Sequence, residues 1–304
     1  MPAPPTQREV DCPRAEGVQA RRVLLYCLQN SGCTLFAMAL AQLPSTIVVP
    51  DLWIGSRIPC PADFRSSALQ PSNATIVVKM TLRAQGAPAH AVDRLSQIRA
   101  AFQPHLVLFL TRDACVNALH LSNKSFANEH GTVVAKMQHW DVLYKQRDTL
   151  ANATFNYESL CDGAGVAPLV ARLHKLGLVR EPEAIATSRL LRFEHNFIDV
   201  KVAAIKGTAH FSTQHRGWPL LHYTISGVKS LPGGLAANTS GLGACRDMVE
   251  REWQACDTMT MGVSDASAAA AWARAAELAP NVAAFYAKFR RRWYAANNAS
   301  RYLE

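Results

Sequence analysis

The sequence predicts an α/β fold of three layers, a parallel sheet flanked by helices, with a C-terminal helical cap. Short continuous apolar runs alternate with helical segments up to about residue 178, as in βαβ units whose strands are buried on both faces. The 304 residues are 49% hydrophobic and 18% charged, a composition typical of globular proteins. Beyond residue 178 the pattern changes to Gly/Pro turns followed by Ala-rich helical periods, which indicates a differently built C-terminal part.

The expected elements follow in chain order from these patterns. Five apolar runs predict strands at 23–28, 46–49, 75–79, 106–110 and 154–157. Intervening segments predict helices at 34–42, 91–102, 114–121, 129–148 and 166–176, and the C-terminal part adds helical periods at 242–256 and 265–296. We divide the chain into a leader at 1–20 and a single domain at 21–304, whose α/β core spans 21–179 and whose cap and acceptor region spans 180–304.

The net charge of +9 and the pI near 9.3 favour an anionic partner: nucleic acid, an acidic membrane surface, a phosphate-bearing cofactor or an acidic substrate. The densest basic run, 288–294, is typical of a solvated helix end, and the alternative is a nucleic-acid or membrane patch. No apolar run reaches the length of about 20 residues that a membrane span needs. We therefore expect no membrane span, and we consider nucleic acid an unlikely partner.

Eight scattered cysteines without a Cys-x-x-Cys pair predict reduced core thiols and no metal knot. The polar N-terminus predicts a cytoplasmic protein, with the Golgi lumen as the alternative for a trimmed chain. Five Asn-x-Ser/Thr sequons are interpreted as chance matches; they start at Asn73, Asn123, Asn152, Asn238 and Asn298.

The junction after the first predicted strand is the main candidate for anion binding. It reads Asn30-Ser31-Gly32-Cys33-Thr34 and leads directly into a helix. Such a loop offers backbone N–H groups and the positive end of a helix dipole to a phosphate. It lacks the first glycine and the lysine of a Walker A loop, which disfavours an ordinary ATPase or GTPase. The alternative interpretation is a simple helix N-cap.

Three stretches in the same order resemble the PAPS-dependent sulfotransferases. NSGCTL (30–35) resembles the loop by which that family holds the 5′-phosphosulfate of PAPS, 3′-phosphoadenosine 5′-phosphosulfate. HLVLFLTRDACVNALHLS (105–122) resembles its strand–Arg-Asp–helix–Ser element, and FNYESLCDGAGVAPLVARLHKLGLV (155–179) resembles its Tyr-Glu-Asp-Leu segment and the helix that follows. The resemblance covers about residues 22–179.

The resemblance implies a P-loop-like fold, PAPS as co-substrate and no metal. It assigns Asn30, Ser31, Gly32, Cys33 and Thr34 to the phosphosulfate, and Arg112 and Ser122 to the 3′-phosphate. Two departures stand out. Asn30 replaces the family's Lys or Arg, and His120 stands eight residues after Arg112, where the family has its Ser.

The implied reaction is an in-line sulfuryl transfer to a hydroxyl or amine of a small molecule or glycan. Asp51, shortly after the second predicted strand, is the expected general base, and Lys79 is the expected cation in place of the one lost at Asn30. Each has a structural alternative: Asp51 as a turn cap, and Lys79 as a surface lysine that snorkels. Glu158 is expected to hold a loop.

Two other function classes stay open beside the sulfotransferase. One is a non-catalytic nucleotide-binding or partner-binding descendant of the fold. The other is a nucleic-acid-binding protein, which rests on net charge and the basic run alone.

Overall fold

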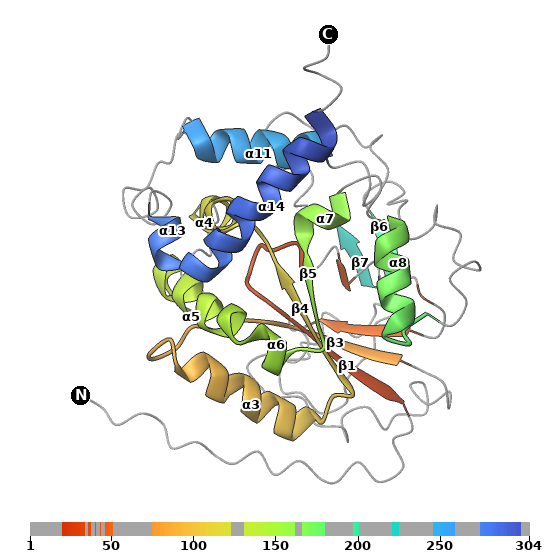
Figure 1. Ribbon diagram of the computed structural model, residues 1–304. Helices are drawn as coiled ribbons and strands as arrows, with labels where there is room; N and C mark the ends of the chain where they lie inside the picture. The colour runs from red at the N-terminus through yellow and green to blue at the C-terminus, as the bar shows by residue number, and fades with distance from the viewer. Residues whose placement is uncertain are drawn as a thin grey trace.

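The computed structural model describes the sheet and most of its helices (Figure 1). The described residues are 20–33, 36, 37, 40, 43, 46–50, 75–122, 131–161, 166–179, 197–200, 221–224, 246–258 and 274–298. Thr34, Asp51 and nearly all of the predicted leader lie outside them, as do the sequons at Asn73, Asn123 and Asn238.

Five strands form one parallel sheet in the order β2-β3-β1-β4-β5. They are β1 (Arg21–Cys27), β2 (Thr46–Pro50), β3 (Thr75–Thr81), β4 (Leu106–Thr111) and β5 (Ala153–Asn156). The chain fills one side of β1 with β2 and β3 before it crosses to the other side for β4 and β5. The carboxyl end of β1 is therefore a topological switch point, where open α/β sheets bind ligands.

Helices cover both faces of the sheet, which confirms the predicted α/β class (Figure 1). The helices of the first 180 residues are α3 (His90–Phe102), α4 (Ala114–Ser122), α5 (Val133–Lys145), α6 (Arg147–Leu150), α7 (Tyr157–Cys161) and α8 (Val166–Lys175). Between β1 and β2, residues 33, 36, 37 and 40 are also helical. Alternating strand residues divide the core: Leu24 and Phe109 pack toward Trp140 of α5, whereas Leu25 packs toward Phe36 and α8.

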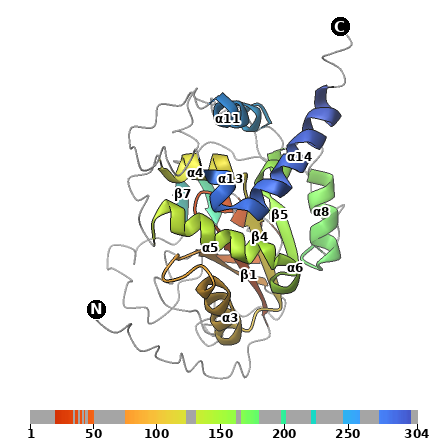
Figure 2. The same cartoon turned by 60° about the vertical axis from the view of Figure 1, so that its left-hand side comes forward.

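The C-terminal helices join the helical layer on the α4–α5 side of the sheet (Figure 2). They are α11 (Arg246–Thr258), α13 (Ala275–Leu278) and α14 (Pro280–Asn298). The Asp141 carboxylate of α5 accepts hydrogen bonds from the backbone N–H groups of Asn281 (2.8 Å) and Val282 (3.0 Å). These bonds satisfy donors that the start of α14 leaves unpaired and fix the helix on α5. Trp253 of α11 and Trp293 of α14 pack against each other in a third core cluster.

The structure differs from the predicted boundaries at a few points. The helix expected at 129–148 begins at Val133, because Gly131 has φ +122° and a Cβ there would lie 2.4 Å from the carbonyl oxygen of Ala84. Thr132 caps it, and Gln146 separates it from α6. The short α7 and the antiparallel pair β6 (Phe197–Val200) and β7 (Leu221–Thr224) were not predicted. None of the described helices is long and apolar enough to span a membrane.

The prediction that the cysteines are reduced is wrong for four of them. Cys27 at the end of β1 is bonded to Cys33 at the start of the following helix, with Cα atoms 6.3 Å apart. Cys115 of α4 is bonded to Cys256 of α11, with Cα atoms 6.1 Å apart. Spacing could not reveal either pair, because the turn of the loop and the docking of α11 bring the thiols together.

Loss of the Cys115–Cys256 disulfide should destabilise the protein. The bond closes a loop of 141 residues in the unfolded chain, so replacing both cysteines by serine should lower the free energy of unfolding by about 2–5 kcal/mol. Urea unfolding of the variant, beside the oxidised and reduced wild type, measures this. Peptide mapping without reductant that finds Cys115 as a free thiol would contradict the assignment.

Candidate anion-binding site

The loop after β1 is shaped by two left-handed residues. Asn30 has φ +63° and Gly32 has φ +81°. Both the backbone N–H and the hydroxyl of Ser31 donate to the carbonyl oxygen of Leu28, at 3.2 and 2.6 Å. The helix then starts, with the Phe36 N–H donating to the Gly32 carbonyl at 3.0 Å. The loop therefore turns back on itself at the carboxyl end of the central strand.

Gly32 is required by packing as well as by conformation. A Cβ at this position would lie 2.1 Å from the Tyr157 ring. The family resemblance assigned Gly32 to the phosphosulfate, whereas its close neighbour in the structure is the ring of Tyr157. Cys33, predicted as a phosphate contact, is tied to Cys27 in the disulfide, which joins the two ends of the loop.

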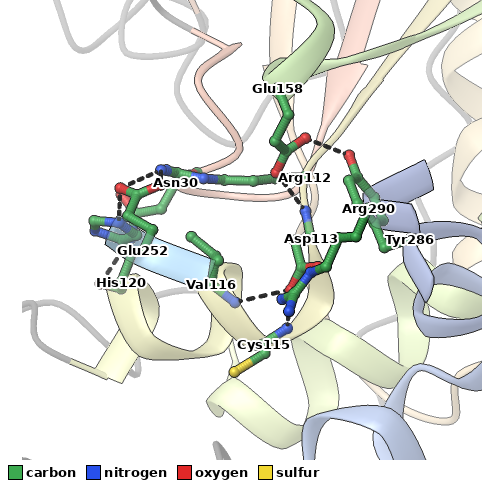
Figure 3. Close-up of polar contacts among 10 residues, drawn as sticks. All are labelled: Asn30, Arg112, Asp113, Cys115, Val116, His120, Glu158, Glu252, Tyr286 and Arg290. Atoms are coloured by element: carbon green, nitrogen blue, oxygen red, sulfur yellow. Dashed lines mark hydrogen bonds and ion pairs between the residues drawn. The ribbon is translucent and has the colours of Figure 1, made fainter. Parts of the chain in front are cut away.

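Arg112 follows the last residue of β4 and reaches the β1 loop. Its Nη1 donates to the carbonyl oxygen of Asn30 at 3.0 Å, and its guanidinium lies 4.4 Å from the centroid of the Tyr157 ring. The side chain is buried, with a relative exposure of 7%. The structure thus brings together Asn30 and Arg112, two of the predicted site residues, from adjacent strands (Figure 3).

Arg112 also has an anionic partner that the sequence did not predict. Its Nη2 donates to both carboxylate oxygens of Glu252 on α11, at 2.7 and 2.6 Å (Figure 3). Burial, the largest single effect, would lower the pKa of Arg112, but the charges of Glu252, Tyr157 and Glu158 together with the hydrogen bond to Glu252 outweigh it and raise that pKa. Burial would likewise raise the pKa of Glu252, but Arg112 and the bond from His120 hold it below its usual value. Both groups are therefore charged.

His120 is part of the same network, whereas Ser122 bonds within its own helix. His120 Nε2 lies 2.8 Å from Glu252 Oε1, and the His120 carbonyl accepts from the Asn30 amide at 3.2 Å. The Ser122 hydroxyl donates to the carbonyl oxygen of Ala118 at 2.7 Å. His120, eight positions after Arg112, therefore lies beside Glu252, the carboxylate partner of Arg112.

A second cluster, behind Arg112, holds the start of α4. Asp113 accepts from the backbone N–H groups of Cys115 and Val116, at 2.9 and 3.2 Å, and forms an ion pair with Arg290 of α14 at 2.8 Å. Glu158 accepts from the Asp113 N–H at 2.9 Å and from the Tyr286 hydroxyl at 2.7 Å. These bonds support the expectation that Glu158 holds a loop in place.

Two lysines lie in the interior of the protein near the carboxyl ends of the strands. Lys79 is buried within β3, two residues before the strand ends, at the register of Leu25. Lys136 of α5 is completely buried, and its ammonium donates to the side-chain oxygen of Gln29 at 2.7 Å. Lys136 was not predicted as a site residue. It lies in the apolar helical stripe formed by Val133, Met137 and Trp140, and this periodicity indicates a position on the buried face of the helix.

Comparison with known proteins gives no further assignment, because no family model and no curated protein matches the chain.

Glu158 should make the stability of the protein depend on pH. Burial raises its pKa from the usual 4.5 to about 7. The folded state therefore binds a proton more tightly than the unfolded state, and stability falls as the pH rises from 4.5 to 7. The change is on the order of 3 kcal/mol.

Glu158→Gln should remove this slope, because the amide is neutral at every pH. Urea unfolding of both proteins between pH 4.5 and 7.5 measures the difference, with the exposed Glu277→Gln as a control. A difference between wild type and Glu158→Gln that is independent of pH would rule out the shifted pKa.

Proposed function

We propose that the protein is a PAPS-dependent sulfotransferase. The observation that carries the proposal is the bond from Arg112, at the end of β4, to the β1 loop, at the switch point of the sheet. PAPS has phosphates on both sides of its ribose, so its binder needs two anion sites at a fixed separation. A loop and an arginine at the ends of adjacent strands are suited to this.

The Arg112 side chain offers a hydrogen-bond donor that fits an anionic ligand. Among the described residues, the buried Nε of Arg112 has no hydrogen-bond partner, and a buried donor of this kind suits a ligand oxygen. In the proposal, residues 30–34 hold the 5′-phosphosulfate and Arg112 holds the 3′-phosphate, with Ser122 as a second contact. The P-loop-like fold belongs to the same proposal.

Bound PAPS supplies the sulfuryl group. The acceptor, a hydroxyl or amine of a small molecule or glycan, forms a bond to sulfur as the bond from sulfur to the 5′-phosphate oxygen breaks, leaving 3′,5′-ADP. Asp51 takes the proton of the acceptor as general base, and Lys79 offsets the negative charge of the leaving phosphate.

Binding of 3′,5′-ADP tests the two-anion site. The wild type should bind 3′,5′-ADP more tightly than 5′-AMP, and loss of Arg112 should cost about 2–3 kcal/mol of binding free energy, as for a buried charge-assisted contact. Because Arg112→Ala alone would leave the buried Glu252 carboxylate without its arginine, the variant for calorimetry is Arg112→Ala with Glu252→Ala.

Arg99→Ala, an exposed arginine of α3, is the matched control for lost positive charge. Equal affinity of the wild type for 3′,5′-ADP and 5′-AMP, or unchanged affinity in the double variant, would count against the assignment.

The second candidate is a non-catalytic nucleotide-binding or partner-binding protein. The Glu252 carboxylate favours it, because it neutralises the arginine that would hold the 3′-phosphate. Asn30 also favours the non-catalytic candidate, because it is uncharged at the position that would lie next to the transferred sulfuryl group.

Transfer from PAPS distinguishes the two candidates. The sulfotransferase should release 3′,5′-ADP from PAPS faster when hydroxyl or amine acceptors are supplied, whereas the non-catalytic protein should bind 3′,5′-ADP without any release. In the second case Asn30→Lys should restore part of the transfer by returning the missing charge. Ser96→Lys, an exposed position on α3, adds the same charge far from the loop as a control.

The disulfides bear on where such a protein works. Disulfides persist in oxidising compartments and are rare in the cytosol. The bonds Cys27–Cys33 and Cys115–Cys256 therefore favour an oxidising compartment, such as the Golgi lumen, over the cytoplasm that the N-terminus predicted.

A further inference from the structure

One sequon of the chain lies on the described surface. Asn152-Ala153-Thr154 is an Asn-x-Ser/Thr motif, the acceptor sequence for N-linked glycans in secreted proteins. Of the five sequons, it is the one whose asparagine and hydroxyl residue both belong to the described residues. The interpretation as a chance match went with the expectation of reduced cysteines in the cytoplasm. The two disulfides remove that expectation, because disulfides persist in the oxidising compartments through which glycosylated proteins pass.

Asn152 lies at the turn between α6 and β5, and it is exposed. Asp148 and Thr149, which precede it in the chain, are exposed too, so the surface around the turn has room for a bulky group. Because β5 starts at Ala153 and all strands of the sheet are parallel, Asn152 lies at the amino ends of the strands. The candidate anion-binding site lies at the opposite, carboxyl ends.

The contacts of the Asn152 amide hold its oxygen and leave its nitrogen open. The backbone N–H of Asn152 donates to the carbonyl oxygen of Val107 at 2.8 Å, and its side-chain Oδ1 accepts from the Val107 N–H at 2.7 Å. Among the described residues, none accepts a hydrogen bond from the Nδ2 amino group of Asn152. A glycan is attached at Nδ2 and leaves the amide oxygen in place, so glycosylated Asn152 would keep both bonds to Val107.

We propose that Asn152 is an N-glycosylation site. The donor is an oligosaccharide whose anomeric carbon is linked to a polyprenyl diphosphate. A bond forms from Asn152 Nδ2 to that carbon as the bond from the carbon to the phosphate oxygen breaks. The polyprenyl diphosphate leaves, one proton of Nδ2 is released, and nothing is oxidised or reduced. The inference is independent of the proposed function, because no residue of the candidate anion-binding site takes part.

Peptide mapping by mass spectrometry tests this site. The full chain is directed into the endoplasmic reticulum of a eukaryotic cell, purified, and treated with a peptide N-glycosidase in water labelled with heavy oxygen. The peptide that contains Asn152 should carry a glycan before treatment and a labelled aspartate after it. Asn156, which is followed by Tyr157 and Glu158 and so is no sequon, should stay unlabelled and controls for spontaneous deamidation.

Two substitutions of Thr154 form a matched pair. Both leave Asn152 and its bonds to Val107 in place, and valine is as well suited to a strand as threonine. Thr154→Val destroys the sequon and should abolish the glycan at Asn152, whereas Thr154→Ser keeps the sequon and should retain the glycan. Urea unfolding of the purified Thr154→Val variant checks that it is folded.

Either of two results would overturn the proposal. One is an unmodified Asn152 in wild-type protein recovered with its disulfides formed. The other is a group on Asn152 that persists in Thr154→Val, because its attachment would then not depend on the sequon. The readout involves no nucleotide, so neither result bears on the proposed sulfotransferase activity.

Discussion

The burial of one guanidinium is the constraint on which the candidate site depends. Arg112 leaves water at the end of β4, so its charge must be compensated within the protein. It is compensated by the Glu252 carboxylate, by the Asn30 carbonyl and by the face of the Tyr157 ring. These groups come from α11, the β1 loop and α7, so one side chain fixes three segments that are distant in sequence. Removing any of these partners would leave the buried guanidinium only partly compensated, which is unfavourable.

The position of α11 follows from this pairing and is reinforced by other contacts. The Cys115–Cys256 disulfide ties α11 to α4, and Arg290 bridges Asp257 of α11 and Asp113 at the start of α4. Trp253 fills the apolar space between them. Because α11 is held by covalent, ionic and apolar contacts, Glu252 is a fixed component of the site. In the proposed site, an incoming anion would therefore meet an arginine whose charge is already balanced, and its attraction would depend on the other cations at the carboxyl ends of the strands.

The sequence revealed the parts of the structure that have a local pattern. The strands were predictable because parallel strands buried on both faces are continuous apolar runs, and Arg112 was predictable as the residue after one of them. Glu252 was not, because it lies 140 residues from Arg112 in an ordinary amphipathic helix. The same holds for the pairing of Cys115 with Cys256. Lys136 did have a local signal, a charged residue within an apolar helical stripe, and that pattern indicates a buried lysine.

The conformation of the loop offers a physical reason for the neutral residue at position 30. Asn30 has φ +63°, in the left-handed region that asparagine adopts more readily than lysine or arginine. Its side-chain amide also donates to the His120 carbonyl, so it ties the loop to α4. A loop built in this way gains a defined shape from Asn30, Gly32 and the Cys27–Cys33 bond but has no cation of its own. In the proposed site, positive charge would then come from side chains of neighbouring elements, and two of the buried cations found there, Arg112 and Lys136, donate directly to loop residues.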